Sequence, residues 1–210
     1  IAWGGFNVTE GGGDSAEVAL ELMPGNKIRK YDTWHAMGQG ATTGSLVVTL
    51  EALKEMHLTP EDIQLIQNDT KTCPDTGMAG ASRSLYMDGN ATIIAANKLL
   101  AAMRKEDGTL RTYDEMKAEG IETKYLGRYE TNTTPGLCRL DPNTGIGDPT
   151  PAFTYCLNLA EVEVDTKTGK TTVLKFTCVD FVGRIGNIDA VKGQAYSCLL
   201  YTSDAADDLI

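Results

Sequence analysis

The residues with the clearest chemical potential form a glycine-rich loop, Met37-Gly38-Gln39-Gly40-Ala41-Thr42-Thr43-Gly44-Ser45. The loop runs into an apolar stretch, residues 46–53, that predicts the first turns of a helix. Glycine permits backbone angles and close approaches that a side chain would block. A helix start presents unpaired N–H groups and the positive end of its dipole, which suit an anionic or acceptor-rich ligand. The spacing matches neither the dinucleotide fingerprint nor the phosphate loop, so a plain strand-to-helix turn is the alternative.

A second junction of the same kind occupies residues 77–84, where small residues again precede a long helical pattern. A strand over residues 63–67 is predicted between the two junctions. Two helix starts that face one cleft would give a ligand a shared positive field. We therefore expect the loop at residues 38–44 and the turn at residues 77–84 to approach one another.

The other residues that could do chemistry lack partners at suitable spacing. The two histidines, His35 and His57, stand on different predicted elements, so we interpret both as structural. The same interpretation is preferred for three isolated aspartates and one cysteine, Asp69, Asp75, Asp88 and Cys73. The five cysteines form no C-x-x-C pair, which argues against a zinc site or iron–sulfur cluster in this segment and favours a reducing compartment.

The composition limits the classes of partner. The formal net charge is −10, so we expect no binding to nucleic acid or to an anionic membrane through a basic surface. Hydrophobic residues make up 41% of the 210 residues, enough for one sizeable core. No apolar run reaches transmembrane length. Because the cysteine pattern favours a reducing compartment, we expect a cytoplasmic protein.

Alternating apolar residues and turn residues predict two β-hairpins. The first spans residues 16–34, with its turn at residues 24–26. The second spans residues 153–179, with a bulge near Ala160. Little periodicity is present over residues 121–150, which we interpret as an extended, turn-rich excursion.

Apolar residues at spacings of three and four predict two long helices. The first covers residues 43–56, with a stripe of Leu46, Leu50 and Leu53. The second covers residues 82–105, with a stripe of Leu85, Ile93, Ala96, Leu99, Leu100 and Met103. Thr112 is expected to cap a short helix over residues 113–119. Together these elements predict an α/β (α+β) fold, a mixed sheet and β-hairpins with two long helices.

Five stretches of the sequence resemble the molybdenum-cofactor-binding part of molybdenum hydroxylases, specifically bacterial aldehyde oxidoreductases of the xanthine oxidase family. They are Met37-Gly38-Gln39-Gly40-Ala41, Ala79-Gly80-Ala81-Ser82-Arg83, Ala2-Trp3-Gly4-Gly5-Phe6, Tyr113-Asp114-Glu115-Met116-Lys117 and Ala160-Glu161-Val162-Glu163-Val164-Asp165. The likeness extends from Ile1 to about Tyr196. It implies a molybdenum-dependent oxidation of aldehydes to carboxylic acids with water as the oxygen donor, within a larger molybdopterin-binding domain.

The resemblance also implies a set of cofactor-binding residues: Gly38, Gln39, Gly40, Ala41, Gly80, Ala81, Ser82 and Arg83. The family often carries His and Asp where this chain has Met37 and Thr42, so direct side-chain contacts at those two positions are in doubt. The implied cofactor is a molybdenum–molybdopterin in its cytosine dinucleotide form. No catalytic residue and no metal ligand is assigned within the chain, because the family's glutamate base lies in a later loop.

The same resemblance sets expectations for the rest of the protein. We expect residues 1–197 to be part of a cofactor domain, with [2Fe–2S] domains that lead to a redox acceptor elsewhere in a homodimeric enzyme. Residues 198–210 depart from the family and are expected to be an adaptor-derived tail. The chain alone is expected to be inactive towards aldehydes. The alternative is a non-catalytic α/β binding or scaffolding module with glycine-rich ligand loops.

Overall fold

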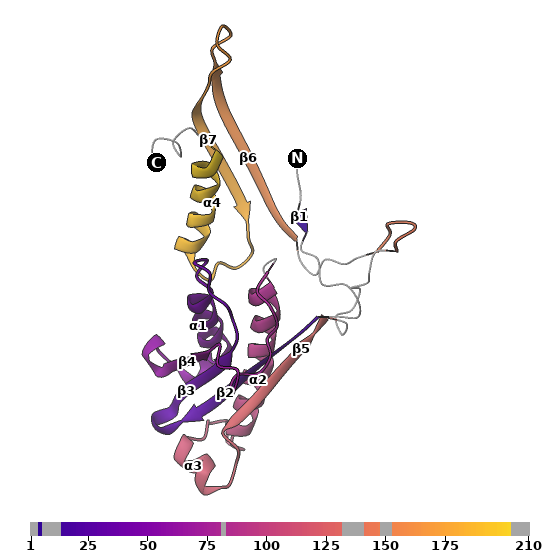
Figure 1. Cartoon of the computed structure of the whole chain (residues 1–210). Coiled ribbons are helices and arrows are strands. Elements are labelled where there is room, and N and C mark those ends of the chain that lie inside the picture. The colour runs from indigo at the N-terminus through magenta and orange to yellow at the C-terminus, as the bar shows by residue number, and fades with distance from the viewer. Residues whose placement is uncertain (1–3, 6–13, 81–82, 132–140, 148–152, 203–210) are drawn as a thin grey trace. The chain divides into compact units, whose positions relative to one another are not determined.

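The computed structural model describes residues 4–5, 14–80, 83–131, 141–147 and 153–202. The chain divides into two compact units. The smaller unit combines residues 1–6 with 152–210, and the larger unit comprises residues 7–151. The larger unit, coloured indigo to pink in Figure 1, contains both glycine-rich junctions.

The larger unit is built on a four-stranded mixed sheet in the order β4-β3-β2-β5. Strands β2 (Ser15–Met23) and β3 (Lys27–Asp32) pair antiparallel and confirm the first predicted hairpin. Strand β4 (Ile63–Gln67) runs parallel to β3 at one edge. Since parallel strands need a crossover, the intervening helix connects them across one face of the sheet.

Strand β5 (Lys124–Glu130) forms the other edge, antiparallel to β2. The prediction of an extended excursion over residues 121–150 is wrong for this part. The strand could not be recognised because its apolar and polar residues do not alternate in the usual way. Leu126 is 44% exposed, and its neighbour Gly127 is buried. A strand that turns a glycine to the core and a leucine to solvent gives no apolar period of two.

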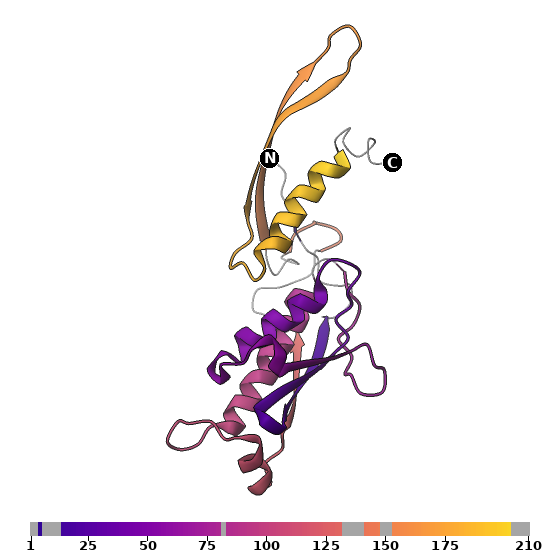
Figure 2. The ribbon, with the colours of Figure 1, turned by 90° about the vertical axis from the view of Figure 1, so that its left-hand side faces the viewer.

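Two helices cover one face of this sheet (Figures 1 and 2). They are α1 (Ala41–Ala52), which a short turn η2 (Lys54–Met56) follows, and α2 (Gly89–Met103), which the π-helical turn η4 (Ser84–Asp88) precedes. Shorter elements are η1 (Pro24–Asn26), η3 (Pro60–Asp62) and α3 (Tyr113–Ala118). Thr112 caps α3 as predicted, in a capping box with Glu115.

The predicted apolar stripe of the second helix is partly wrong. Leu85 and Ile93 are 61% and 45% exposed, whereas Ala91 and Ala95 are fully buried. For Ile93, which lies in α2, the cause is a close approach between α2 and β5. A Cβ on Gly127 would lie 2.0 Å from the carbonyl oxygen of Ala91 and 2.5 Å from the backbone nitrogen of Ala95. Only small residues fit at this contact, so the larger side chains point outward.

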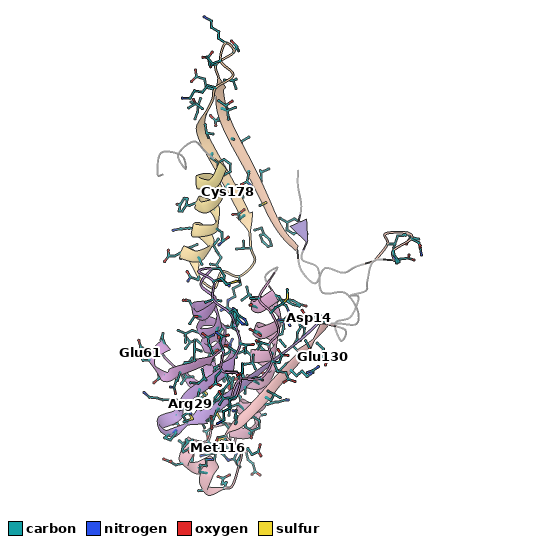
Figure 3. The ribbon with its side chains drawn as sticks, viewed as in Figure 1. Asp14, Arg29, Glu61, Met116, Glu130 and Cys178 are labelled. Carbon is teal, nitrogen blue, oxygen red and sulfur yellow. The ribbon has the colours of Figure 1, made fainter. Side chains whose placement is uncertain are left out.

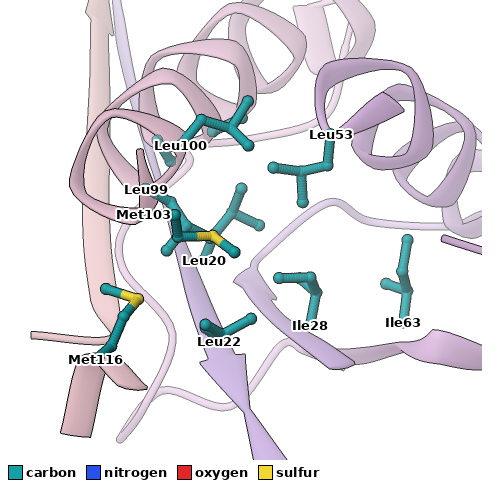
Figure 4. Packing of buried hydrophobic residues seen from close by; sticks show 11 residues of the cluster. Leu20, Leu22, Ile28, Leu53, Ile63, Leu99, Leu100, Met103 and Met116 are labelled. Atoms are coloured by element: carbon teal, nitrogen blue, oxygen red, sulfur yellow. The ribbon is translucent and has the colours of Figure 1, made fainter. Parts of the chain in front are cut away.

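The core lies between this sheet face and the helices (Figure 4). Leu99, Leu100 and Met103 of α2 pack with apolar side chains of the sheet and of the first helix, namely Leu20, Leu22, Ile28, Ile63 and Leu53. Met116 of α3 is fully buried in the same cluster. Figure 3 shows it at the opposite end of the sheet from Asp14 and Glu130, where β2 begins and β5 ends.

The smaller unit confirms the second predicted hairpin. Strands β6 (Phe153–Val164) and β7 (Thr171–Phe181) pair antiparallel, and the register shifts between Glu161 and Val162, next to the predicted bulge. Strand β1 (Gly4–Gly5) adds to β6, and helix α4 (Ile188–Thr202) follows the hairpin. This helix includes residues 198–202, and the adaptor origin of residues 198–210 stays a prediction. In the described part of the chain, no helix is long and apolar enough to cross a membrane.

Candidate functional site

The first glycine loop connects the end of β3 to α1. Gly38 and Gly40 adopt left-handed φ angles of 99° and 81°, which only glycine adopts without strain. The helical hydrogen bonds of α1 begin with the Gly44 N–H, which donates to the Gly40 carbonyl at 2.9 Å. The N–H groups of residues 41–43 therefore have no helical acceptor. A Cβ added at either left-handed glycine would meet no atom of the described chain within 4 Å, so the loop presents bare backbone.

Gln39 closes this loop on itself. Its Oε1 accepts a hydrogen bond from the Met37 N–H at 2.5 Å, and its Nε2 donates to the His35 carbonyl at 2.9 Å. An amide side chain has two donor and two acceptor positions, so one of each remains for a ligand. The sequence predicted a ligand contact for Gln39, and the structure adds a role in shaping the loop.

The second junction is organised around Arg83, which is 7% exposed. Its Nε and Nη2 donate to the two carboxylate oxygens of Asp14 at 2.5 and 2.6 Å. Its other N–H groups donate to the carbonyls of Ser15, Thr76 and Met78. All five guanidinium donors thus serve protein acceptors. In this structure the guanidinium therefore anchors the turn, and its predicted contact with a cofactor stays a prediction.

Gly77 lets that anchor form. It has a left-handed φ of 72°, and a Cβ on it would lie 2.6 Å from Nη2 of Arg83. The carbonyl of Gly80 accepts the Arg83 N–H at 2.7 Å, which starts the helical stretch. The other two predicted site residues of this turn, Ala81 and Ser82, lie outside the described residues.

The two junctions approach one another, as predicted. Thr33 and Thr76 link them reciprocally, since each backbone N–H donates to the other residue's hydroxyl, at 3.1 and 3.2 Å. The two hydroxyls are also hydrogen bonded to each other. Beside this link lies a hollow of about 290 Å³. It is lined by His35 and Ala36, which lead into the first loop, by Met37 at the start of that loop, by Met78 and Ala79 of the second junction, and by Asn68 after β4.

The lining of the hollow is adaptable and largely apolar. Met37 and Met78 are 72% and 71% exposed, and thioether side chains adapt readily to flat ligands. Asn68 adopts a left-handed φ of 61°, which places a polar side chain at the end of β4. Of these residues, His35 is interpreted as structural from the sequence, Met78 belongs to the predicted second junction, and the sequence assigns no ligand role to Asn68. An asparagine directly after a strand was the available signal, because asparagine tolerates this conformation.

A buried polar cluster lies beneath the first loop, on the sheet face that the helices cover. Lys30, Asp32 and Asp88 are 0%, 0% and 1% exposed. Lys30 Nζ lies 3.3 Å from Asp32 Oδ2, an ion pair without hydrogen-bond geometry. Burial lowers the pKa of Lys30 and raises the pKa of Asp88 to about 7. The Asp88 carboxyl therefore holds a proton more readily than an exposed aspartate does.

The remaining candidates from the sequence have local roles. Asp69 and Asp75 accept backbone N–H groups of their own turns, from Lys71 and Gly77 at 2.8 Å each. The thiol of Cys73 donates to the Ile66 carbonyl at 3.2 Å. His57 ends η2. Among the described residues, no three His, Cys, Asp or Glu side chains gather to hold a metal ion.

The sequence pattern of the molybdopterin cofactor-binding domain matches residues 1–200. The chain belongs to this family. It is 38% identical over 188 residues to the aldehyde oxidoreductase of Megalodesulfovibrio gigas, which covers 90% of this chain and 20% of that protein. The crystal structure of the aldehyde oxidoreductase from Desulfovibrio desulfuricans superposes with a TM-score of 0.82 at 39% identity, covering 93% of this chain and 21% of that one. A Cu,Mo-CO dehydrogenase shares the fold, with a TM-score of 0.65 at 17% identity over 86% of this chain and 24% of that one.

This molybdopterin cofactor-binding chain is thus homologous to molybdenum hydroxylase oxidoreductases and spans about a fifth of the length of the relatives named above. Its first loop fits an acceptor-rich group. The left-handed glycines keep side chains away from the loop surface, and three N–H groups at the start of α1 have no helical acceptor. The fit rests mainly on backbone, because the guanidinium of Arg83 is engaged within the protein.

Proposed function

We propose that this chain contributes two cofactor loops to an enzyme that oxidises aldehydes to carboxylic acids with water as the oxygen donor. One observation carries the proposal. The two junctions of the matched domain are linked through Thr33 and Thr76, and they line one hollow. The similarity to two aldehyde oxidoreductases supports an aldehyde as the substrate class.

The residues that would hold the cofactor are those with free backbone donors and open approach. Gly38 and Gly40 would let the group lie against the loop, and the N–H groups of residues 41–43 would donate to its phosphate or pterin acceptors. The remaining donor and acceptor of Gln39 would bind a pterin edge. Gly80 would admit the group at the second turn. When bound, a molybdenum–pterin group supplies the redox chemistry, while these residues bind and orient it.

The nucleotide form of the pterin is part of the same proposal. We infer the cytosine dinucleotide, on the resemblance to bacterial aldehyde oxidoreductases. Its pyrophosphate would match the positive end of α1, where three N–H groups precede the first helical bond.

The proposal is tested on the complete protein that contains this chain. We expect molybdenum near one atom per chain, release of CMP from the pterin on hydrolysis, and carboxylate formation from an aldehyde with oxygen from labelled water. A protein that is folded, lacks both molybdenum and pterin after expression in a host that makes the cofactor, and leaves aldehydes unchanged would support the alternative of a non-catalytic module.

A further inference from the structure

We propose that Asp32, paired with Lys30, is a positioning residue that holds the first glycine loop in its cofactor-binding shape. Asp32 is the last residue of β3 and is fully buried. The proposal rests on the proposed function of that loop, and it concerns what sets the loop's geometry.

One carboxylate bonds both ends of the loop. Oδ2 of Asp32 accepts a hydrogen bond from the Ser45 hydroxyl at 2.7 Å, in the first turns of α1. Oδ1 accepts the Trp34 N–H, at 3.4 Å, where the chain enters the loop. Residues 35–44 therefore lie between Trp34 and Ser45, which both donate to the Asp32 carboxylate. Loss of this group would free the entry and the exit of the loop to move apart.

The same carboxylate connects the loop to the neighbouring strand. Gln67 Nε2, at the end of β4, donates to Oδ1 of Asp32 at 2.8 Å. The Asn68 N–H donates to the Asp32 carbonyl at 3.1 Å. Asn68 lines the hollow together with His35 and Met37. Asp32 thus sets the position of the first loop relative to another wall of the same hollow.

Lys30 gives this carboxylate its counter-charge. Its ammonium lies 3.3 Å from Oδ2 and 5.1 Å from the centre of the Trp34 ring. Trp34 is 3% exposed, and a Cβ on Gly44 would lie 3.5 Å from its Cζ2. A buried ion pair seldom stabilises a fold more than well-packed apolar residues would. Its occurrence directly beneath the loop favours a role in fixing conformation.

Two hydroxyls on α1 provide a matched pair of variants. Ser45 and Thr49 are both fully buried, one turn apart. The Ser45 hydroxyl donates to Asp32, whereas the Thr49 hydroxyl donates to the Ser45 carbonyl of its own helix, at 2.7 Å. Ser45→Ala and Thr49→Ala each remove one buried hydroxyl, but only the first removes a contact to Asp32.

The experiment uses the complete cofactor-loaded protein that contains this chain. Amide hydrogen exchange of residues 35–44 and the rate of molybdenum and pterin loss are measured for both variants, along with thermal stability. We expect amide exchange of residues 35–44 and cofactor loss to be about tenfold or more faster in Ser45→Ala than in Thr49→Ala. The reason is that only Ser45→Ala removes a hydrogen bond to a charged acceptor. Asp32→Asn should have a larger effect, and Ser45→Ala keeps the test informative if that variant does not fold.

The outcomes separate this proposal from the function on which it rests. Equal exchange of residues 35–44 in Ser45→Ala and Thr49→Ala would overturn the positioning role and leave the cofactor assignment standing. Faster exchange with unchanged cofactor loss would overturn it as well, because the loop shape would then not matter for binding. A wild-type protein without molybdenum or pterin would reject the proposed function and this inference together.

Discussion

The replacement of Gly127 by alanine tests the packing of the larger unit. A Cβ at this position would lie 2.0 Å from the Ala91 carbonyl oxygen, 2.5 Å from the Ala95 nitrogen and 3.0 Å from the Ala95 Cβ. Ordinary contacts between carbon atoms are at about 3.5–4.0 Å, so α2 and β5 would have to separate by roughly 1 Å or more. Two of the three atoms belong to the helix backbone and cannot rotate away. Overpacking costs about 1–3 kcal/mol and occasionally more, and we expect about 3 kcal/mol here.

The assay is urea unfolding of the chain in a Trp3→Phe background, in which the buried Trp34 reports on the larger unit. Gly89→Ala is the matched control, because a Cβ there would meet only Val48 Cγ1, at 4.0 Å. Gly89 begins α2, so its replacement should be neutral or stabilising by up to about 1 kcal/mol. Unfolding free energies of Gly127→Ala and wild type within about 0.5 kcal/mol would refute the close approach of α2 to β5.

Two further predictions concern the junctions and the buried charges. Gly77→Ala should destabilise the larger unit by about 2–4 kcal/mol, because the new Cβ strains a left-handed residue and displaces the guanidinium of Arg83 from Asp14. The control is Gly25→Ala, where φ is 76° and an added Cβ would meet no atom within 4 Å. Urea unfolding should show that this control loses about 1 kcal/mol of unfolding free energy. Equal losses of unfolding free energy in Gly77→Ala and Gly25→Ala would contradict the role of the Arg83 contact. Burial raises the pKa of Asp88 from 3.8 to about 7, so its contribution to stability is full below about pH 4 and is lost as pH rises through 7. Relative to Asp88→Asn, the wild type should therefore lose at most about 4 kcal/mol of unfolding free energy between pH 4 and 8, and a pH-independent difference would refute this.

Local chemistry explains which parts of the fold could be predicted. The first hairpin has a clear alternation and a turn at residues 24–26, and α3 has the capping box of Thr112 and Glu115. Such signals depend on neighbours in sequence. Strand β5 could not be predicted, because its inward position is Gly127, and the value of that glycine lies in its contact with α2. The outward position of Ile93 in α2 has the same cause.

The site was predicted less completely than the fold. The first loop could be identified because glycine content and a following helix are visible in sequence. The role of Arg83 could not, since its partner Asp14 lies 69 residues away. The Thr33–Thr76 link, across 43 residues, was equally invisible. A basic side chain at a turn of small residues suits either a ligand or a buried carboxylate, and only the tertiary structure distinguishes the two.

The central claim, that the first glycine loop binds the molybdenum–pterin cofactor, is tested most directly by Gly40→Val and Gly108→Val in the complete protein. Both glycines are left-handed, with φ of 81° and 86°, and a Cβ at either would meet no described atom within 4 Å. Both variants therefore carry similar backbone strain, about 1–2 kcal/mol, and should stay folded. We predict that Gly40→Val loses most of its molybdenum and pterin while Gly108→Val retains both. Equal cofactor content in the two folded variants would contradict the claim.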